Sequence, residues 1–551
     1  MVPRASLPKF RLKMMFLAIA GACAGVSATS PALAFQIDSG NPDLRMSWDN
    51  TVKYSAAWRV GDIKSRVADN SIGVQANTND GDQNFDKGLI SNRLDLLSEF
   101  DLRYKRKYGL RLSGAAWYDD VYNKSNDNPG AFGGALVNSR SVDYDEFTDD
   151  TEKLHGRKAE LLDAFVYGSF APGDMGLNLK AGRFTQLYGE SLFFGNNGIA
   201  GAQTSLDLIK ALSVPNSQFK EILRPIGQVS GQLQINSNVS VGAYYQLEWR
   251  KSRLPGAGSY FSFADFVDEG GEGLITPFGL ATRGDDIDAK DSGQGGVQMR
   301  ITSGDYEFGV YAAQFHDKMP QFYLYPDIGV YEQVYAEDIR TVGFSVSTLV
   351  GETNVAAEMS FRDNMPLVAS GNTVILPASL GADGDNNAAF PVGRTLHLNL
   401  SAISVFSENS IWDAASFIGE FAFNRRLSVT DNRDQLDPLA TRDAGALQFI
   451  FTPEYFQVMP GVDLQVPIGL GYGLFGRSSV NGVLFPSENG GNVSIGIKAE
   501  YQKTVQTSLN FTHYYGSDGS VINYDTAAPE LSYKNFHGDR DFISLSIQRT
   551  F

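Results

Sequence analysis

The chain has 551 residues, 63 acidic against 46 basic, a formal net charge of −17, one cysteine and five histidines. The acidic balance argues against nucleic acid as a partner, because nucleic acids are bound largely through Lys and Arg. The scarcity of Cys and His argues against a Cys/His zinc site, and the presence of only one helical apolar run excludes a polytopic helical membrane protein.

The N-terminal segment 1–34 has the layout of a cleaved signal peptide. Basic residues lie between Arg4 and Lys13, Met14–Val26 is an apolar run, and Ala32–Ala34 supplies an A-x-A cleavage site. The apolar run is too short to anchor the chain in a bilayer as a helix. We therefore expect export, and a mature chain over 35–551 that forms a single domain.

The first expected strand, Leu44–Val60, alternates between apolar and polar residues. Its even positions read Leu, Met, Trp, Asn, Val, Tyr, Ala, Trp and Val, and its odd positions are mostly charged or hydroxyl-bearing. A period of two is typical of a β-strand with one apolar and one polar face.

The same alternation recurs in pairs of segments joined by short turns. In chain order the pairs are 94–104 with 108–118, 162–170 with 177–184, 229–235 with 239–249, 297–301 with 306–310, 342–348 with 355–361, 396–406 with 412–423, 444–451 with 464–474 and 493–501 with 505–515. Long segments separate them, near 61–91, 120–158, 187–225, 251–292, 317–337, 363–393, 425–442, 475–490 and 516–540. The first strand and a last strand at 541–551 are expected to pair and close the sheet.

Short turns on one side and long loops on the other are typical of an outer-membrane barrel, with the turns periplasmic and the loops extracellular. We therefore predict an all-β fold, a transmembrane antiparallel outer-membrane β-barrel of about 18 strands (about 16–18). The last strand ends on Phe551, which resembles the assembly signal of bacterial outer-membrane proteins. The expected location is the outer membrane of a Gram-negative cell. The expected partners are outer-membrane lipid, lipopolysaccharide and the barrel-assembly machinery.

Charged residues recur on the polar faces of the expected strands and beside them. A charge that faces lipid costs about 2–4 kcal/mol at the membrane midplane, so these residues are expected to face the lumen. Our candidates for the lumen are Arg183, Glu190, Arg340 and Glu358.

Apolar clusters mark three of the long loops. In 187–225, Ser205 is placed to cap a short helix with Leu206, Ile209 and Leu212 on one face. The loops 251–292 and 317–337 are rich in Phe and Tyr. Such clusters either pack on one another or bind an apolar solute at the mouth of the barrel. For the second reading, the expected capture residues are Leu206, Phe261 and Phe263.

An acidic motif in the first long loop raises the question of a metal. Side-chain oxygens recur at alternate positions, on Asp80, Asp82, Asn84 and Asp86, as they do in calcium loops. The motif lacks the glycine and the distal Glu of an EF-hand, and Asx turns explain the spacing equally well. Calcium is therefore an alternative only, and no cofactor is expected.

Catalysis has no support in the sequence. No G-x-S-x-G motif occurs, and none of the five histidines has a readable nucleophile partner. We expect that the protein is not an enzyme.

Several motifs together make the chain similar to a known family. They are Phe35–Asp43 followed by Arg45–Ser55, Asn79–Asp86, Gly182–Phe184 with Tyr188–Ser191, Arg250–Ser262, Glu337–Thr341 and Glu358–Asn364. They resemble a proteobacterial family of outer-membrane β-barrels that is catalogued as a domain of unknown function, and the likeness extends over essentially the whole mature chain. Members are often encoded beside a second uncharacterised outer-membrane protein and an exporter-like inner-membrane protein. The resemblance implies the handling of lipids, sterols or other hydrophobic compounds.

The sequence favours an outer-membrane channel or transporter that passes hydrophobic or amphipathic small molecules. One alternative is a diffusion porin for small polar solutes, in which the acidic charge gives a preference for cations. Another is a barrel that acts as the partner of a periplasmic or surface protein.

Overall fold

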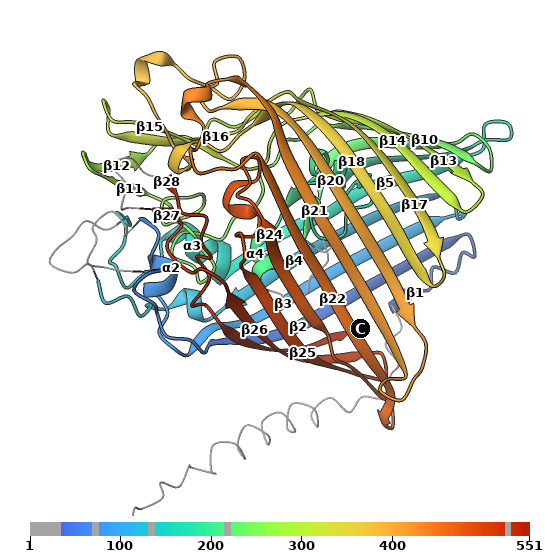
Figure 1. Cartoon of the computed structure of the whole chain (residues 1–551). Coiled ribbons are helices and arrows are strands. Elements are labelled where there is room, and N and C mark those ends of the chain that lie inside the picture. The colour runs from blue at the N-terminus through green and yellow to red at the C-terminus, as the bar shows by residue number, and fades with distance from the viewer. Residues whose placement is uncertain (1–34, 69–76, 131–137, 214–221, 524–529) are drawn as a thin grey trace, which may run out of the picture.

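The computed structural model describes residues 35–68, 77–130, 138–213, 222–523 and 530–551. The expected signal peptide lies outside the described residues. Tilted antiparallel strands close into one barrel, and the long loops gather at one of its ends (Figure 1). The short turns lie at the opposite end.

Within the described residues the barrel has 18 strands, which confirms the prediction. In chain order they are β2 (Leu44–Arg59), β3 (Leu89–Tyr104), β4 (Tyr108–Asp119), β5 (Arg157–Phe170), β6 (Gly176–Phe184), β9 (Ile226–Gln234), β10 (Val239–Gln246), β13 (Gly295–Ser303), β14 (Tyr306–Phe315), β17 (Ile339–Val350), β18 (Thr353–Pro366), β20 (Val392–Phe406), β21 (Ala414–Asp431), β22 (Asp443–Met459), β23 (Val462–Gln465) continued by β24 (Ile468–Phe475), β25 (Gly491–Tyr501), β26 (Val505–Tyr515) and β29 (Phe542–Thr550).

The first and last strands close the barrel. β29 pairs with β2 from Thr51↔Thr550 to Arg59↔Phe542. The short β1 (Phe35–Ile37) pairs with residues 46–48, near the start of β2. β23 and β24 act as one strand because both pair with β22 and with β25. The break between them contains Pro467, which cannot donate a backbone hydrogen bond to a ladder.

The alternation in the sequence is the alternation between the outer and inner faces of the barrel. On β3, Leu94 and Leu96 are exposed on the outer face, while Arg93 and Asp95 form an ion pair on the inner face. An apolar outer face and a polar lumen are the arrangement of an outer-membrane barrel. None of the helices in the described residues is long and apolar enough to cross a membrane.

The turn between β3 and β4 carries no glycine and is nevertheless tight. Lys105 and Arg106 both have positive φ, 52° and 56°, which is the conformation of a type I′ hairpin. Gln502 and Lys503 between β25 and β26 repeat it, with φ of 49° and 57°.

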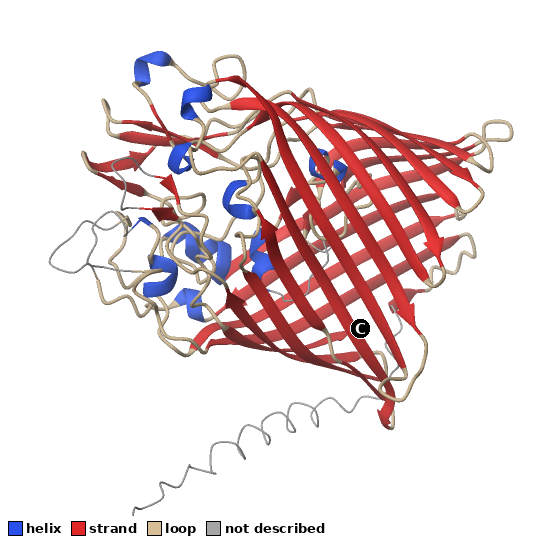
Figure 2. Ribbon diagram, viewed as in Figure 1, coloured by secondary structure: helices blue, strands red, loops and turns tan. Residues whose placement is uncertain are grey.

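The loop end contains short helices and a second, smaller sheet (Figure 2). Its helices are α2 (Asp80–Gln83), η2 (Val121–Asn123), α3 (Asp149–Thr151), η4 (Glu152–Gly156), η5 (Ile199–Ala202), α4 (Leu208–Ser213), η7 (Ser370–Asn372), η8 (Ala378–Leu380), η9 (Arg433–Gln435) and η10 (Gly482–Leu484). Its strands are β7 (Ser205–Leu206) with β8 (Leu223–Arg224), β27 (Ile522–Asn523) with β28 (Glu530–Leu531), and a five-stranded sheet of β11 (Gly273–Thr276), β12 (Gly279–Arg283), β16 (Val330–Val334), β15 (Gln321–Tyr325) and β19 (Val374–Ile375).

Apolar cores hold this loop layer together. One cluster surrounds Tyr323, Val334 and Phe390, and another surrounds Phe266, Phe322 and Tyr331. We call the packed layer of long loops the roof. Its cores join strands and loops that are far apart in the sequence.

Candidate functional site

The described part of the third long loop that follows β6, residues 185–213, folds into the barrel. The backbone N–H groups of Leu192, Phe193 and Phe194 donate to Oε2 of Glu420 on β21 at 3.1, 2.5 and 2.8 Å. Asn399 donates to the other oxygen of this carboxylate at 2.6 Å. Successive N–H groups around one carboxylate form an anion nest, and the lumenal side chain of Glu420 is buried by it. The barrel wall therefore holds the loop inside the lumen.

A second lumenal carboxylate, Glu358 on β18, holds the same loop. It accepts hydrogen bonds from the backbone N–H groups of Glu190 and Ile199, both at 2.5 Å. Gly189 has a φ of +92°, and a Cβ atom there would collide with the Glu358 carboxylate. The loop can approach this closely because glycine tolerates that conformation and leaves space for the carboxylate.

A guanidinium completes the anchor. Nη2 of Arg362 on β18 donates to the carbonyl oxygens of Asn196, Asn197 and Gly198 at 2.9, 3.2 and 2.7 Å. The Asn197 amide donates in turn to Oδ1 of Asn399 at 2.9 Å. The sequence reasoning did not single out Arg362 or Asn197. Arg362 lies four residues after Glu358 on the same face of the strand. The alternation of side chains could therefore have predicted that Arg362 faces the lumen.

The loop then crosses to the opposite wall. Leu212, at the end of α4, packs against an apolar cluster that includes Phe542 of β29. Lys210 on α4 interacts electrostatically with Lys53 of β2. The expected helix begins later than predicted, because Asp207 caps it by accepting from the Lys210 N–H at 3.0 Å. Ser205 and Leu206 instead form β7.

The expected capture residues lie within and beneath the roof. Phe261 is 9% exposed, and its ring lies 5.0 Å from Tyr260 and 5.4 Å from Phe542. Phe263 is half-buried and 5.9 Å from Phe536. Leu206 is half-buried against a small cluster in the third loop. All three contact other apolar loop residues, and their role in solute capture stays a prediction.

Two of the remaining lumen candidates form ion pairs. Glu190 lies in the lumen, where Arg300 on β13 donates to it at 2.8 Å. Arg183 is at the loop end of β6 and pairs with Glu248 at 2.6 Å.

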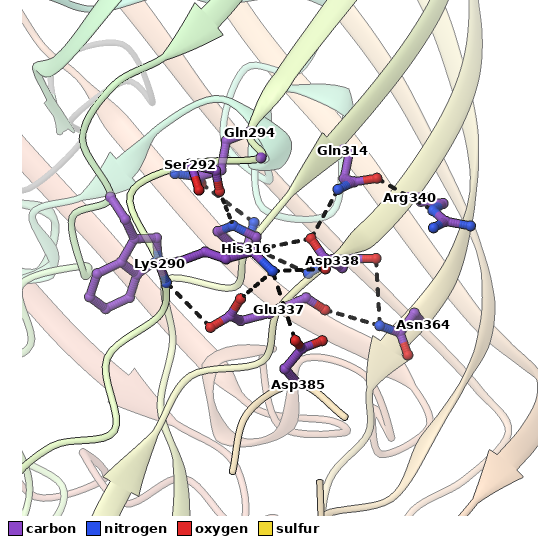
Figure 3. A network of polar contacts seen from close by, with 12 residues as sticks. Lys290, Ser292, Gln294, Gln314, His316, Glu337, Asp338, Arg340, Asn364 and Asp385 are labelled. Carbon is purple, nitrogen blue, oxygen red and sulfur yellow. Dashed lines mark hydrogen bonds and ion pairs between the residues drawn. The ribbon is translucent and has the colours of Figure 1, made fainter. Parts of the chain in front are cut away.

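Arg340 does not face the lumen, contrary to the sequence-based expectation. It shares the outer face of β17 with the exposed Val342 and Phe344. Figure 3 shows it beside Gln314 at the rim of the barrel, where its Nε donates to the Gln314 side chain at 3.4 Å. Charge on the outer face costs little near the interface, so the rule that charges face the lumen fails at the rim.

The rim also holds the one group of three acidic side chains in the described residues that is close enough to bind a metal ion. The ammonium of Lys290 lies 2.8 Å from Glu337, 3.0 Å from Asp338 and 3.8 Å from Asp385 (Figure 3). Hydrogen bonds to Glu337 and Asp338 raise the pKa of Lys290. The lysine already supplies the positive charge that these carboxylates need.

The calcium motif of the first loop does not converge on one point. Asp82 on α2 is fully buried and binds two guanidiniums, Arg59 at 3.0 Å and Arg540 at 2.8 Å. Although burial acts to raise it, these arginines hold the pKa of Asp82 below its usual value. Asp86 instead lies apart, with its backbone N–H donating to Asp127 at 3.0 Å. The alternation of oxygens thus reflects loop packing.

The family follows from comparison of the whole chain with known families. Residues 14–551 match the model described as protein of unknown function (DUF1302). The chain belongs to this family. No curated protein matches the chain.

Solved structures match the chain over most of its length at low identity and low TM-score. OmpF of Salmonella typhi, in a complex with daunomycin, is 9% identical with a TM-score of 0.38, and 94% of this chain and 100% of that chain are covered. OccAB2 of Acinetobacter baumannii is 8% identical with a TM-score of 0.42, with 92% and 98% covered. OpdK of Pseudomonas aeruginosa, solved with vanillate, is 9% identical with a TM-score of 0.40, with 92% and 98% covered. The apolar outer face and polar lumen of this DUF1302 barrel are the arrangement of an outer-membrane barrel.

Proposed function

We propose that this barrel passes hydrophobic or amphipathic small molecules, lipid-, sterol- or hydrocarbon-like, across the outer membrane. The observation that carries the proposal is the apolar packing of the described loops at one end of the barrel. Residues 190–199 of the third loop are bound to the lumenal wall, and other loops pack through apolar cores. An apolar environment favours the binding of apolar solutes, which transfer readily out of water, and disfavours strongly hydrated solutes.

The outer end of the roof supports capture from outside. Phe278, Ile328 and Leu380 are 78%, 58% and 59% exposed, and they lie at the turns of the five-stranded sheet and just beyond it. The backbone N–H of Ala378 donates to Asp327, which ties two of these turns together. Exposed apolar side chains that gather in this way are typical of a contact site for an apolar molecule.

The lower lumen is polar and supports the second candidate, a diffusion porin. Arg111 on β4 pairs with Asp101 at 2.8 Å and also binds Glu99 on the facing β3. A charged lumen suits small polar solutes, and it also suits the headgroup of an amphipathic one.

Uptake by whole cells separates the two candidates. An intact outer leaflet of lipopolysaccharide slows both apolar and polar probes, so cells that produce the barrel are compared with cells that do not. We expect faster uptake of the apolar dye N-phenyl-1-naphthylamine, with little change in the periplasmic hydrolysis of a polar chromogenic β-lactam.

Matched variants locate the capture surface. Phe278→Ser removes an exposed apolar side chain from the roof and is expected to slow dye uptake. Leu349→Ser changes one that is 64% exposed at the opposite end of the barrel and serves as the control. A larger gain for the β-lactam than for the dye would replace the proposal by the diffusion porin.

A further inference from the structure

Two guanidiniums lie over the ring of Trp117, near the loop end of β4. Cζ of Arg93 is 4.8 Å from the centre of the indole, and Cζ of Arg253 is 5.6 Å from it. The indole N–H donates to the carbonyl of Leu154 at 3.1 Å, which fixes the ring. Two cations at one aromatic ring repel each other, and nearby negative charge is needed to offset this repulsion.

More basic side chains surround this pair. Arg224, Arg250 and Lys158 interact electrostatically with Arg253, while Lys53 interacts with Arg93 and with Lys210 of the crossing helix α4. We call these residues the basic neck. Its members are Lys53, Arg93, Lys158, Lys210, Arg224, Arg250 and Arg253.

Carboxylates balance only part of the basic neck. Arg253 pairs with Glu160 at 2.5 Å and with Asp207 at 2.6 Å, and Arg93 pairs with Asp95 at 2.7 Å. Within the described ranges, no carboxylate oxygen lies within 4.0 Å of the side-chain nitrogens of four other members. These four are Lys53, Lys158, Lys210 and Arg224. In a chain with 63 acidic and 46 basic residues, this local excess of positive charge is the reverse of the overall balance.

Arg224 is a buried member of the basic neck, and it lies near both cations and carboxylates. Its Nη1 donates to the carbonyl of Lys251 at 2.6 Å. Burial, together with the charges of Arg253 and Arg250, lowers the pKa of Arg224 to about 9, although Asp207 and Glu160 act to raise it. A bound anion would relieve both the burial penalty and the repulsion.

We propose that the basic neck binds the carboxylate of an amphipathic organic anion, with the apolar body of the anion against Trp117. Guanidinium groups match carboxylates in geometry and charge, and an indole offers a flat apolar surface. Lys210 lies on the third loop and interacts electrostatically with Lys53 of the barrel wall, so the neck joins the loop to the lumen. The inference rests on the proposed function and narrows its substrate class to anions.

Three isosteric probes test the assignment with the full chain in lipid nanodiscs. They are 1-naphthoate, 1-naphthylmethanol and 1-naphthylmethylammonium, measured by equilibrium dialysis against empty nanodiscs. We expect the anion to bind at least tenfold more tightly than the other two. Its affinity is expected to fall as salt is added, because salt screens the attraction between the anion and the basic neck.

Variants assign the binding to the neck. Lys210→Gln changes an exposed side chain and is expected to weaken naphthoate binding several-fold, and adding Arg224→Gln is expected to weaken it further. Lys498→Gln, on β25, is the control outside the neck. Heat-modifiability on gels reports that each variant is folded.

The outcomes separate this inference from the proposed function. Equal binding of the anion and the neutral alcohol, or naphthoate binding that Lys210→Gln leaves unchanged, overturns the basic neck and leaves the apolar channel standing. If propionate binds as tightly as naphthoate, the anion site at the basic neck is supported, and the proposal that the solute has an apolar body is overturned. Absence of binding by all three naphthalene probes overturns the neck.

Discussion

Replacing the Glu420 carboxylate by an amide releases the third loop from the barrel wall. The carboxylate accepts from three backbone N–H groups, of Leu192, Phe193 and Phe194, and from Asn399. A hydrogen bond to a charged group contributes about 1.5–3 kcal/mol, about twice the net value of a neutral one. Glu420→Gln keeps one acceptor oxygen and removes the negative charge. It also places an NH2 group, which cannot accept a hydrogen bond, among groups that donate. The expected loss is about 3 kcal/mol in the docked state of the loop, or on the order of 100-fold in its population.

Planar bilayers measure this shift as open time. The wild-type channel is expected to be mostly closed, with openings in Glu420→Gln more frequent by on the order of 100-fold, because each 1.4 kcal/mol is tenfold in an equilibrium constant. Trypsin is expected to cut the variant faster at Lys210, on the released segment. The control is Glu500→Gln on β25, whose carboxylate binds Gln506. If Glu420→Gln and the control matched wild type in both open time and cleavage, the loop would not be held in the way described.

Three other perturbations follow from the same contacts. Gly198→Ala places a Cβ against Ser191 and the Glu358 carboxylate, so it should open the channel as Glu420→Gln does, whereas Gly176→Ala, which meets only Gln234 at 3.7 Å, should have no effect on conductance. Burial raises the pKa of Asp80 to about 6, and burial together with the Asp80 charge raises that of Asp265. Because these pKa values are raised, the pair costs stability as pH rises from about 4 through 6 and above. Asp265→Asn should therefore raise the unfolding temperature at pH 8, with the gain vanishing below pH 4, and an equal gain at both pH values would contradict this reasoning. Lys290→Ala leaves Glu337, Asp338 and Asp385 without their cation, so the unfolding temperature of the variant, unlike that of wild type, should rise with added calcium.

The strands of the barrel were predictable because their signal is local. Each hairpin is a short turn between two segments of period two, and the faces then follow from the alternation of side chains. The pairing of β2 with β29 followed from the even number of strands and the need to leave no open edge.

The site was less predictable because its contacts are long-range. Glu420 is 226 residues from Phe194 in the sequence, and no local pattern in either segment indicates that the two are in contact. Arg340 was misplaced because charge alone was used, although its even position, shared with Val342 and Phe344, pointed outward. The motif around Asp82 left calcium open as an alternative, because a buried ion pair and a cation loop both require carboxylates.

Asp82 has a consequence for the assembly of the barrel. Arg59 is the last residue of β2, and Arg540 lies just before β29. The single carboxylate of Asp82 in the first loop therefore binds both strands that close the barrel, at its loop end. Such a clasp can form only when the terminal strands have met and the first loop has docked, since breaking one partner of a buried pair leaves an uncompensated charge. Docking of the first loop is thus coupled to closure of the barrel, because Asp82 has both guanidinium partners only when β2 and β29 are paired.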